Sequence, residues 1–349
     1  MSEIVLATEP EYEKGKETFR AAEGLEVQPA PEDEASLSQA ALASDCRAVI
    51  VGGTQYLGPL YEALGRTGEA GQKPKDVNAS SPAPRAIIAR FGVGHDGVDK
   101  AKARRHRVIV ANTPGVLNVS VAEHVLWLIG ALARRIPAFD ARLRAGRFDA
   151  LPGDEISGKA LGVIGFGAIG RCVARMAHRA FGMRILAVDC RTGADLERSE
   201  GRPMDEIQSA YGLEVYTDDA HRVLRQADVV SLHLPATDET RHFINADRLA
   251  LMKPGAFLVN TARGAVLDEM ALYDALTGGR LAGAALDVFE TEPYRPVAPD
   301  KDLRTLDNVV LTPHVSSNTR ESNRRMARAC LENIANFFAG RLEKVTRVE

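Results

Sequence analysis

Three polar side chains in the second half of the chain have the types that proton transfer to a carbonyl group requires. Arg263 lies in "LVNTARGAVLDE", Glu292 in "ALDVFETEP" and His314 in "LTPHVSSNT". An arginine presents a planar fork to a carboxylate, and a histidine moves a proton readily near neutral pH. A glutamate beside that histidine favours the imidazolium and orients the ring. Each residue alone could be a salt-bridge arginine, a loop carboxylate or a core histidine, so the interpretation depends on the motifs around them.

A glycine motif upstream indicates a dinucleotide site. Gly165, Gly167 and Gly170 form G-x-G-x-x-G between an apolar run and a helical pattern. The first glycine allows a tight turn, the second lets a pyrophosphate approach the backbone, and the third lets helix and strand pack closely. The helix N-terminus adds free N–H groups and a positive dipole end. With a nicotinamide present, Arg263 would hold and polarise a 2-keto acid and His314 would protonate its oxygen after hydride transfer.

Asp189, at the end of the next predicted strand, indicates which dinucleotide is bound. A carboxylate there accepts hydrogen bonds from the ribose hydroxyls and repels a 2′-phosphate, so the sequence favours NAD (NADH) over NADP. Arg191 is the one residue that argues against this preference, because an arginine could bind the 2′-phosphate of NADP. The alternative interpretation of Arg191, a solvated loop arginine, is the favoured one.

The elements that must position these residues alternate along the chain. Apolar runs typical of buried strands are separated by helical patterns, which predicts an α/β fold with doubly wound parallel sheets. The predicted strands are Arg47–Val51, Ala86–Ala89, Val108–Ala111, Ala160–Gly165, Arg184–Asp189, Val229–Leu232, Ala256–Asn260, Gly283–Val288 and Val309–Leu311. Residues 62–85 are expected to form a surface loop, and residues 191–210 a second polar excursion. Ligands bind beyond the carboxyl ends of such strands, and the three polar stretches that contain Arg263, Glu292 and His314 lie there.

Composition narrows the class of protein. The chain has 349 residues, enough for two domains, and a net charge of −3, which gives no sign of a nucleic-acid partner. Its four cysteines are scattered and predict reduced packing residues of a cytoplasmic protein, with no metal site. No signal peptide is expected at the N-terminus. The apolar stretch 119–136 contains Glu123 and His124 and is predicted to be a buried or interface helix rather than a membrane span.

Together these motifs resemble the D-isomer-specific 2-hydroxyacid dehydrogenase family, which includes glycerate, hydroxypyruvate, D-lactate and 3-phosphoglycerate dehydrogenases. The similarity covers roughly residues 45–340 and includes "FGVGHDGVD", "ANTPGVLNVSVAEH", "GVIGFGAIG", "ADVVSLHLPATDETRHFIN" and the three polar stretches. It implies Arg263, Glu292 and His314 as the catalytic residues, and substrate binding by Arg263 and by the backbone amides of Val93 and Gly94. The cofactor contacts that it implies are Val125, Gly165, Gly167, Ala168, Ile169, Gly170, Asp189, Leu234, Pro235, Thr240, Thr261, Ala262, Asp287, His314 and Ser317.

The resemblance also implies how the domains are arranged. Residues 1–117 and 316–349 would form a discontinuous, flavodoxin-like substrate domain, and residues 118–315 a Rossmann NAD-binding domain, with catalysis in the cleft between them. Family members dimerise through the helix in the region 119–136, so a homodimer is expected here. Formate dehydrogenases of the family carry glutamine as the partner of the histidine, so Glu292 argues against formate. No regulatory domain is expected after His314.

Other functions remain open on the same fold. One is an NAD(H)-sensing, corepressor-like protein without enzymatic activity, and another is a dehydrogenase of an inorganic donor such as phosphite. Retention of all three catalytic residues favours the enzyme. The stretch "GGTQY", Gly52–Tyr56, contains no arginine or lysine for a phosphate, whereas Thr54, Gln55, Tyr56 and His95 offer neutral hydrogen bonds. The sequence therefore predicts a small unphosphorylated 2-hydroxy or 2-keto acid.

Overall fold

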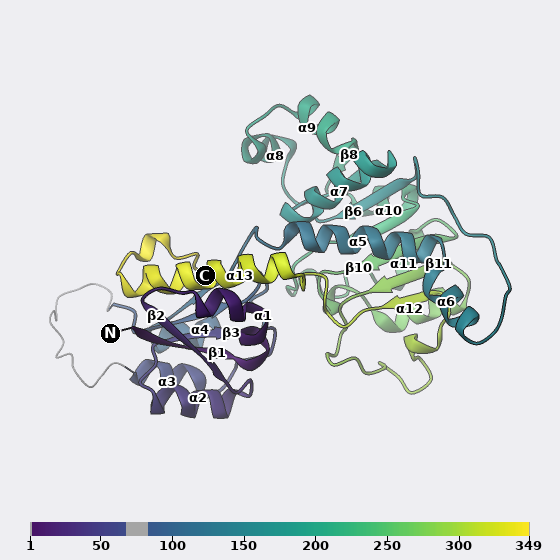
Figure 1. The fold of residues 1–349 in the computed structure, drawn as a ribbon. Coiled ribbons are helices and arrows are strands. Elements are labelled where there is room, and N and C mark those ends of the chain that lie inside the picture. The colour runs from purple at the N-terminus through teal and green to yellow at the C-terminus, as the bar shows by residue number, and fades with distance from the viewer. Residues whose placement is uncertain (1, 68–82, 349) are drawn as a thin grey trace. The chain divides into compact units, whose positions relative to one another are not determined.

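The computed structural model describes residues 2–67 and 83–348 of the chain. The described chain divides into two compact units, each with its own parallel sheet. Unit 1 contains Met1–Leu117 and Asn318–Glu349, and unit 2 contains Asn118–Ser317. In Figure 1, unit 1 is purple to blue with the yellow C-terminal helix, and unit 2 is teal to yellow-green.

Unit 1 is built on a five-stranded sheet of order β2-β1-β3-β4-β5, in which every neighbouring pair is parallel. The strands are β1 (Glu3–Thr8), β2 (Leu25–Ala30), β3 (Ala48–Val51), β4 (Ala86–Arg90) and β5 (Val108–Ala111). The helices are α1 (Glu9–Arg20), α2 (Glu34–Ala43), α3 (Leu60–Arg66), α4 (Lys100–Arg105) and α13 (Arg320–Phe338), followed by the 3₁₀ turn η3 (Leu342–Lys344). This strand order is that of flavodoxin-like sheets, and α13 packs against α1.

Unit 2 is built on a seven-stranded parallel sheet of order β12-β11-β10-β9-β6-β7-β8. Its strands are β6 (Ala160–Ile164), β7 (Arg184–Val188), β8 (Leu213–Thr217), β9 (Val229–Leu232), β10 (Ala256–Asn260), β11 (Leu281–Leu286) and β12 (Val309–Leu311). Its helices are α5 (Asn118–Ala133), α6 (Ile136–Arg144), α7 (Ala168–Phe181), α8 (Gly193–Glu200), α9 (Met204–Tyr211), α10 (Ala220–Gln226), α11 (Ala246–Leu251) and α12 (Glu269–Thr277), with 3₁₀ turns η1 (Gly264–Val266) and η2 (Leu303–Thr305). The order reverses between β6 and β9, as in dinucleotide-binding sheets, so the predicted fold class is confirmed.

Helices cover both faces of the unit 2 sheet, which is why its strands are apolar along their whole length. One core layer joins α5, α7 and α9 to the sheet through residues such as Ile129 and Val173. The other layer joins α10, α11 and α12 through residues such as Val223 and Leu272. With both faces buried, the carboxyl edge of the sheet is the place where polar side chains can gather.

Two segments differ from the expected loops. Residues 62–66 belong to helix α3 rather than to a surface loop, while residues 68–82 of that stretch lie outside the described residues. Residues 191–210 contain α8 and nearly all of α9. Leu196 of α8, and Ile207 and Tyr211 of α9, are buried in the core of unit 2. Each helix is short and offers only one or two apolar residues to the core, too few for a helical period to stand out in a polar sequence.

Strands β1, β2 and β8 were not predicted. β2 and β8 are the edge strands of their sheets, and their partly exposed residues carry polar side chains that hide the strand pattern. The predicted helix 119–136 is also shorter than expected: α5 ends at Ala133, and Arg135 adopts a left-handed conformation (φ 53°) before α6 begins.

Other features of the described residues concern thiols and membranes. Cys46, Cys172 and Cys330 are buried, as expected of packing residues, and Cys190 is exposed. Within residues 2–67 and 83–348, every helix is too short or too polar to cross a bilayer.

Candidate active site

The glycine turn of unit 2 is shaped by close backbone contacts. Gly165 follows β6 with φ +96°, and a Cβ there would lie 2.7 Å from the carbonyl oxygen of His233. A Cβ on Gly170 would lie 2.2 Å from the carbonyl oxygen of Gly165. A Cβ on Gly167, by contrast, would meet no described atom within 4 Å, so the backbone is open at the position where the motif predicts a phosphate. Helix α7 begins at Ala168, and its first-turn N–H groups face this opening without helical partners.

Asp189 lies directly after β7 and is engaged by Arg191. Arg191 donates from Nε to Oδ1 of Asp189 (2.9 Å) and from a terminal nitrogen to Oδ2 (2.9 Å). The backbone N–H of Phe166 also donates to Oδ2 (3.0 Å). Burial disfavours the charged carboxylate, but these hydrogen bonds outweigh it and hold the pKa of Asp189 below its ordinary value. Arg191 is therefore not the solvated loop arginine that was favoured, because it forms a two-pronged ion pair with Asp189.

The three proposed catalytic residues follow adjacent strands. Arg263 lies beyond β10, Glu292 beyond β11 and His314 beyond β12, and these strands are neighbours in the sheet. Nδ1 of His314 lies 2.7 Å from Oε2 of Glu292. Arg263 is near enough for its positive charge to help lower the pKa of Glu292. The structure thus brings the three residues together within unit 2, at the edge where parallel sheets bind ligands.

Glu292 is arranged to serve as an ionised partner. Its Oε1 accepts a hydrogen bond from the backbone N–H of Phe289 (3.0 Å), while its Oε2 faces His314. Burial works against ionisation, but the hydrogen bond and charge of His314 outweigh it, so the pKa of Glu292 lies below its usual range. Since Nδ1 of the imidazole is held by Glu292, Nε2 is the nitrogen that can exchange a proton with a substrate. His314 adopts a left-handed backbone (φ 52°), a conformation that is uncommon for non-glycine residues.

Asp287 anchors the loop that carries His314, a role that the sequence did not reveal. It is fully buried at the end of β11. Its Oδ1 accepts hydrogen bonds from the hydroxyl of Thr312 (2.6 Å) and the N–H of Val315 (2.8 Å), and its Oδ2 accepts from the N–H of Ser316 (2.8 Å). Its own carbonyl oxygen accepts from the N–H of His314 (2.8 Å). The only sequence signal for this role was an acid placed directly after a strand. The implied contact of Asp287 with the nicotinamide stays a prediction.

The other expected cofactor residues lie on neighbouring parts of unit 2. Leu234 and Pro235 follow β9, and the hydroxyl of Thr240 donates to the carbonyl oxygen of Pro235 (2.6 Å). Thr261 and Ala262 follow β10, and the buried hydroxyl of Thr261 has no hydrogen-bond partner among the described residues. The remaining positions are Val125, buried in α5, Ile169 in the first turn of α7, and Ser317 at the end of the unit. A glycine cradle and an unpaired buried hydroxyl are features that a bound dinucleotide would complete.

Two of the three expected substrate-binding residues belong to unit 1, while Arg263 belongs to unit 2. Val93 and Gly94 follow β4, and Nε of Arg90 donates to the carbonyl oxygen of Gly94 (3.0 Å). Tyr56, expected to offer a hydrogen bond to the substrate, is instead fully buried, with its hydroxyl on the carbonyl oxygen of Glu32 (3.2 Å). The apolar surroundings of this tyrosine are supplied by residues distant in sequence, which "GGTQY" alone did not indicate.

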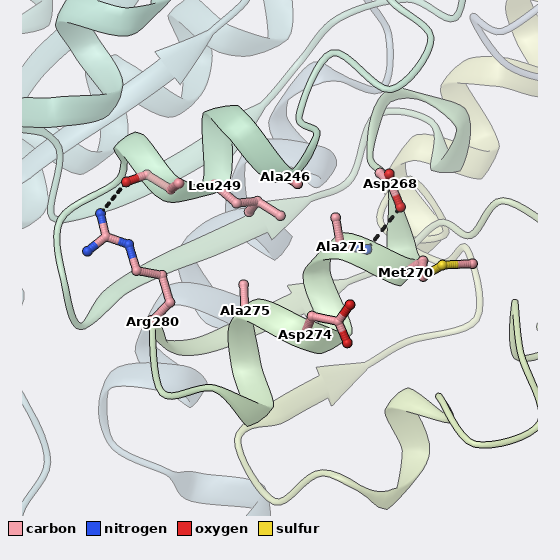
Figure 2. Close-up of a pocket in the computed structure, with 9 residues that line it drawn as sticks. Ala246, Leu249, Asp268, Met270, Ala271, Asp274, Ala275 and Arg280 are labelled. Carbon is pink, nitrogen blue, oxygen red and sulfur yellow. Dashed lines mark hydrogen bonds between the residues drawn. The ribbon is translucent and has the colours of Figure 1, made fainter.

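A pocket of about 430 Å³ between α11 and α12 lies elsewhere in unit 2 (Figure 2). It contains none of the expected site residues and is lined largely by alanines and other apolar side chains, with Asp268, Asp274 and Arg280 among them. Asp268 caps α12 by accepting the N–H of Ala271 (2.9 Å), and Arg280 donates to the carbonyl oxygen of Ala250. Both side chains have structural partners, although the buried Nε of Arg280 has none among the described residues. Because no residue of the glycine motif or of the Arg263, Glu292 and His314 group lines the pocket, it does not compete with the strand-end site.

Comparison with known proteins agrees with this geometry. The family model of the NAD-binding domain of D-isomer-specific 2-hydroxyacid dehydrogenases matches residues 126–316. The chain is 39% identical over 276 residues to a glyoxylate reductase of Korarchaeum cryptofilum, covering 77% of this chain and 78% of that protein. It is 42% identical over 250 residues to a hydroxypyruvate reductase of Thermotoga maritima, covering 71% of this chain and 76% of that protein.

A solved structure shares the fold along almost the whole chain. The D-lactate dehydrogenase of Aquifex aeolicus, crystallised with NAD and lactic acid, matches with a TM-score of 0.75 at 28% sequence identity. The match covers 99% of this chain and 98% of that one. The chain therefore belongs to the D-isomer-specific 2-hydroxyacid dehydrogenase family, and residues 126–316 are its NAD-binding domain.

Proposed function

We propose that this NAD-dependent dehydrogenase interconverts a small, unphosphorylated 2-keto acid and the D-2-hydroxy acid. The observation that carries the proposal is the 2.7 Å contact between His314 and Glu292, beside Arg263 on the neighbouring strand ends. An ionised carboxylate on Nδ1 makes the histidine a proton shuttle at Nε2, which the interconversion of a ketone and an alcohol requires. A protein that only senses NAD(H) has no need of this arrangement.

The residues divide the chemistry between them. Arg263 binds the substrate carboxylate and polarises its carbonyl group. The bound nicotinamide supplies the hydride. In reduction, protonated His314 donates from Nε2 to the carbonyl oxygen, and in oxidation neutral His314 accepts the hydroxyl proton. Glu292 stabilises the imidazolium, and Asp287 keeps the His314 loop in place.

The substrate's size and charge are inferred from unit 1. We assign to unit 1 the role of substrate domain, with the amides of Val93 and Gly94 binding the carboxylate. Near this loop, Arg90 is buried and braces Gly94, which supports a structural role for this cation. In the Gly52–Tyr56 stretch, Thr54 forms a hydrogen bond with the carboxylate of Glu32, which brings a negative charge rather than a positive one. These features favour a glyoxylate-like or hydroxypyruvate-like substrate over a phosphorylated one.

Asp189 and Arg191 together govern the choice of cofactor. Asp189 accepts the N–H of Phe166, and the Arg191 guanidinium donates both to the two carboxylate oxygens of Asp189 and to the carbonyl oxygen of Phe166 (2.9 Å). A ribose can compete with Arg191 for the carboxylate, but a 2′-phosphate would meet the charge of Asp189. NAD(H) is therefore the preferred form.

A second copy of this chain is the proposed partner of the α5–α6 surface. Helices α5 and α6 and the segment that follows α6 carry apolar side chains that a monomer would leave in water: Val119 (45% exposed), Trp127 (72%), Ile136 (57%), Leu143 (59%) and Phe148 (98%). Large apolar and aromatic groups at this density are typical of interfaces. We propose a homodimer through it, and a cytoplasmic location, where the exposed thiol of Cys190 would stay reduced.

A substrate panel tests the proposed reaction. Glyoxylate and hydroxypyruvate should oxidise NADH, measured by loss of its absorbance, with a higher kcat/KM than 3-phosphohydroxypyruvate. The reason is that a phosphate needs a cation that the Gly52–Tyr56 stretch does not supply. Phosphite with NAD serves as the control for the inorganic-donor alternative. A clear preference for the phosphorylated acid would overturn the substrate assignment, and turnover of none of these compounds would favour the NAD(H) sensor.

The proton shuttle predicts a directional pH effect. Glu292→Gln should move the pH profiles of both reduction and oxidation toward lower pH, because the charge that favours the imidazolium is removed. His314→Ala should lower kcat roughly 10²–10⁴-fold, the usual scale of general acid–base catalysis. His221→Ala, at an exposed histidine of α10, is the matched control. Profiles that stay unchanged in Glu292→Gln would remove Glu292 from the mechanism.

Cofactor preference should follow the Asp189–Arg191 pair. The wild type should have a higher kcat/KM for NADH than for NADPH. Asp189→Ala should reduce that ratio roughly tenfold or more, the scale of a charged hydrogen bond worth about 1.5–3 kcal/mol. Arg191→Ala should raise the ratio, since the group that could bind a 2′-phosphate is gone. Steady-state kinetics with both cofactors decides this, and a wild type that prefers NADPH would reverse the assignment.

The homodimer predicts that charge on the exposed apolar surface will separate the subunits. Trp127→Glu with Phe148→Glu should convert the dimer to a monomer in light scattering coupled to size-exclusion chromatography. Burying two carboxylates in an apolar interface is strongly unfavourable. Met270→Glu, at an exposed methionine of α12, is the control and should remain dimeric. A wild type that is monomeric at micromolar concentration would refute the interface.

A further inference from the structure

Two further glutamates lie next to the Glu292–His314 pair and exchange hydrogen bonds with each other. Glu269 is the first residue of α12, and Glu290 lies shortly before Glu292 in the loop after β11. The N–H of Glu290 donates to Oε1 of Glu269 (2.6 Å), and the N–H of Glu269 donates to Oε1 of Glu290 (3.0 Å). Each side chain thus binds the backbone of the other residue, which fastens the start of α12 to the Glu292 loop.

The segment that carries Arg263 also contacts the Glu292 loop directly, through the backbone. Gly264 directly follows Arg263, and a Cβ on it would lie 1.8 Å from the carbonyl carbon of Phe289 and 2.4 Å from the nitrogen of Glu290. Any side chain at this position would push the two segments apart. The backbone of the Arg263 segment is therefore packed directly against the backbone of the Glu292 loop. The hydrogen bonds between Glu269 and Glu290 lie next to this contact.

A third segment holds this junction from outside. Nε2 of His242 lies 2.9 Å from Oε2 of Glu290, and the N–H of His242 donates to the carbonyl oxygen of Ala265 (2.7 Å). Two residues after His242, the carbonyl oxygen of Ile244 accepts the N–H of Asp268 (2.9 Å), just before α12. Glu290 is thus held by both Glu269 and His242, so its place in the loop is fixed on two sides.

Glu269 occupies an environment that suits a neutral carboxyl group. It is 2% exposed, and its Oε2 is buried with no hydrogen-bond partner in the described part of the chain. Burial raises its pKa to about 7; the charges of Glu290 and Glu292 add to the shift and the N–H of Glu290 opposes it. The other titratable groups facing this junction are Tyr294 and, beyond Glu290, His242. A protonated Glu269 keeps Oε1 as an acceptor without adding a third negative charge.

We propose that Glu269 and Glu290 are positioning residues that hold the Glu292 loop against the Arg263 segment and thereby keep Glu292 on Nδ1 of His314. The inference rests on the proposed role of His314 and Glu292 in proton transfer. In this role neither glutamate is assigned a contact with the substrate. Their effect reaches the reaction through Glu292, because a loop that moves away would leave the imidazole without its carboxylate.

The test compares full-length variants that remove or retain the acceptor. Glu269→Ala deletes it, whereas Glu269→Gln retains an oxygen for the N–H of Glu290 and mimics the neutral acid. Glu197→Ala is the matched control, because Glu197 also accepts a backbone N–H, that of Met204 (2.7 Å), but lies in α8. Hydrogen–deuterium exchange of peptides covering residues 286–294 reports the loop without any need for catalysis. Kinetics with glyoxylate or hydroxypyruvate and NADH report the consequence.

In Glu269→Ala, the 286–294 peptides should exchange faster, and kcat should fall roughly 10- to 100-fold, as expected when catalytic groups are slightly misplaced. The KM for NADH should stay unchanged, and the pH profile should shift to lower pH, as in Glu292→Gln. Glu269→Gln should restore exchange, kcat and profile, and Glu197→Ala should match the wild type. Glu290→Ala should reproduce Glu269→Ala and replaces it if that variant does not fold.

Unchanged exchange and unchanged kcat in both alanine variants would overturn the proposal. A shifted KM for NADH with an unshifted pH profile would also overturn it, because the glutamates would then act on the fold in general. Failure of the proposed function looks different: the wild type would reduce no 2-keto acid, while the exchange experiment would still decide whether the glutamate pair holds the loop.

Discussion

The active site depends first on one buried carboxylate, Asp287, which converts the end of a strand into a rigid support. Three groups of the following loop donate to its two oxygens, and its backbone accepts from His314. A buried acid is costly unless its oxygens are paired, so the loop must fold in one way to satisfy it. In the loop held by these hydrogen bonds, His314 has a left-handed conformation and its Nδ1 lies 2.7 Å from Oε2 of Glu292. The contact between His314 and Glu292 therefore depends on a loop whose groups pair the buried oxygens of Asp287.

Parallel strand order supplies the second constraint. Because β10, β11 and β12 are neighbours and run in the same direction, residues that follow them arrive at the same edge. This is why Arg263, Glu292 and His314 could be grouped from sequence alone, although they are far apart in the chain. The glycine motif was predictable for a similar reason, since its spacing reflects backbone contacts that leave no room for Cβ at Gly165 and Gly170.

Features that depend on side-chain pairing between segments could not be predicted in this way. The ion pair of Arg191 with Asp189 requires knowing how the chain turns after β7, and the anchoring role of Asp287 requires the path of the loop after β12. The burial of Tyr56 was also missed, because the residues that cover it are distant in sequence. The edge strands β2 and β8, and the helices α8 and α9, escaped detection because partial exposure blurs the apolar pattern.

The proposed acid–base pair His314–Glu292, the Asp287 anchor and the two further glutamates all lie between Asn118 and Ser317. The hydrogen bonds described above between His314 and Glu292, and between His314 and Asp287, are made by residues of this unit. Under the roles proposed for the two units, natural variation or laboratory selection in unit 1 can change the size and polarity of the acid while the proposed acid–base residues of unit 2 keep their hydrogen bonds. An engineer seeking a new product would diversify unit 1 and hold the strand ends of unit 2 constant.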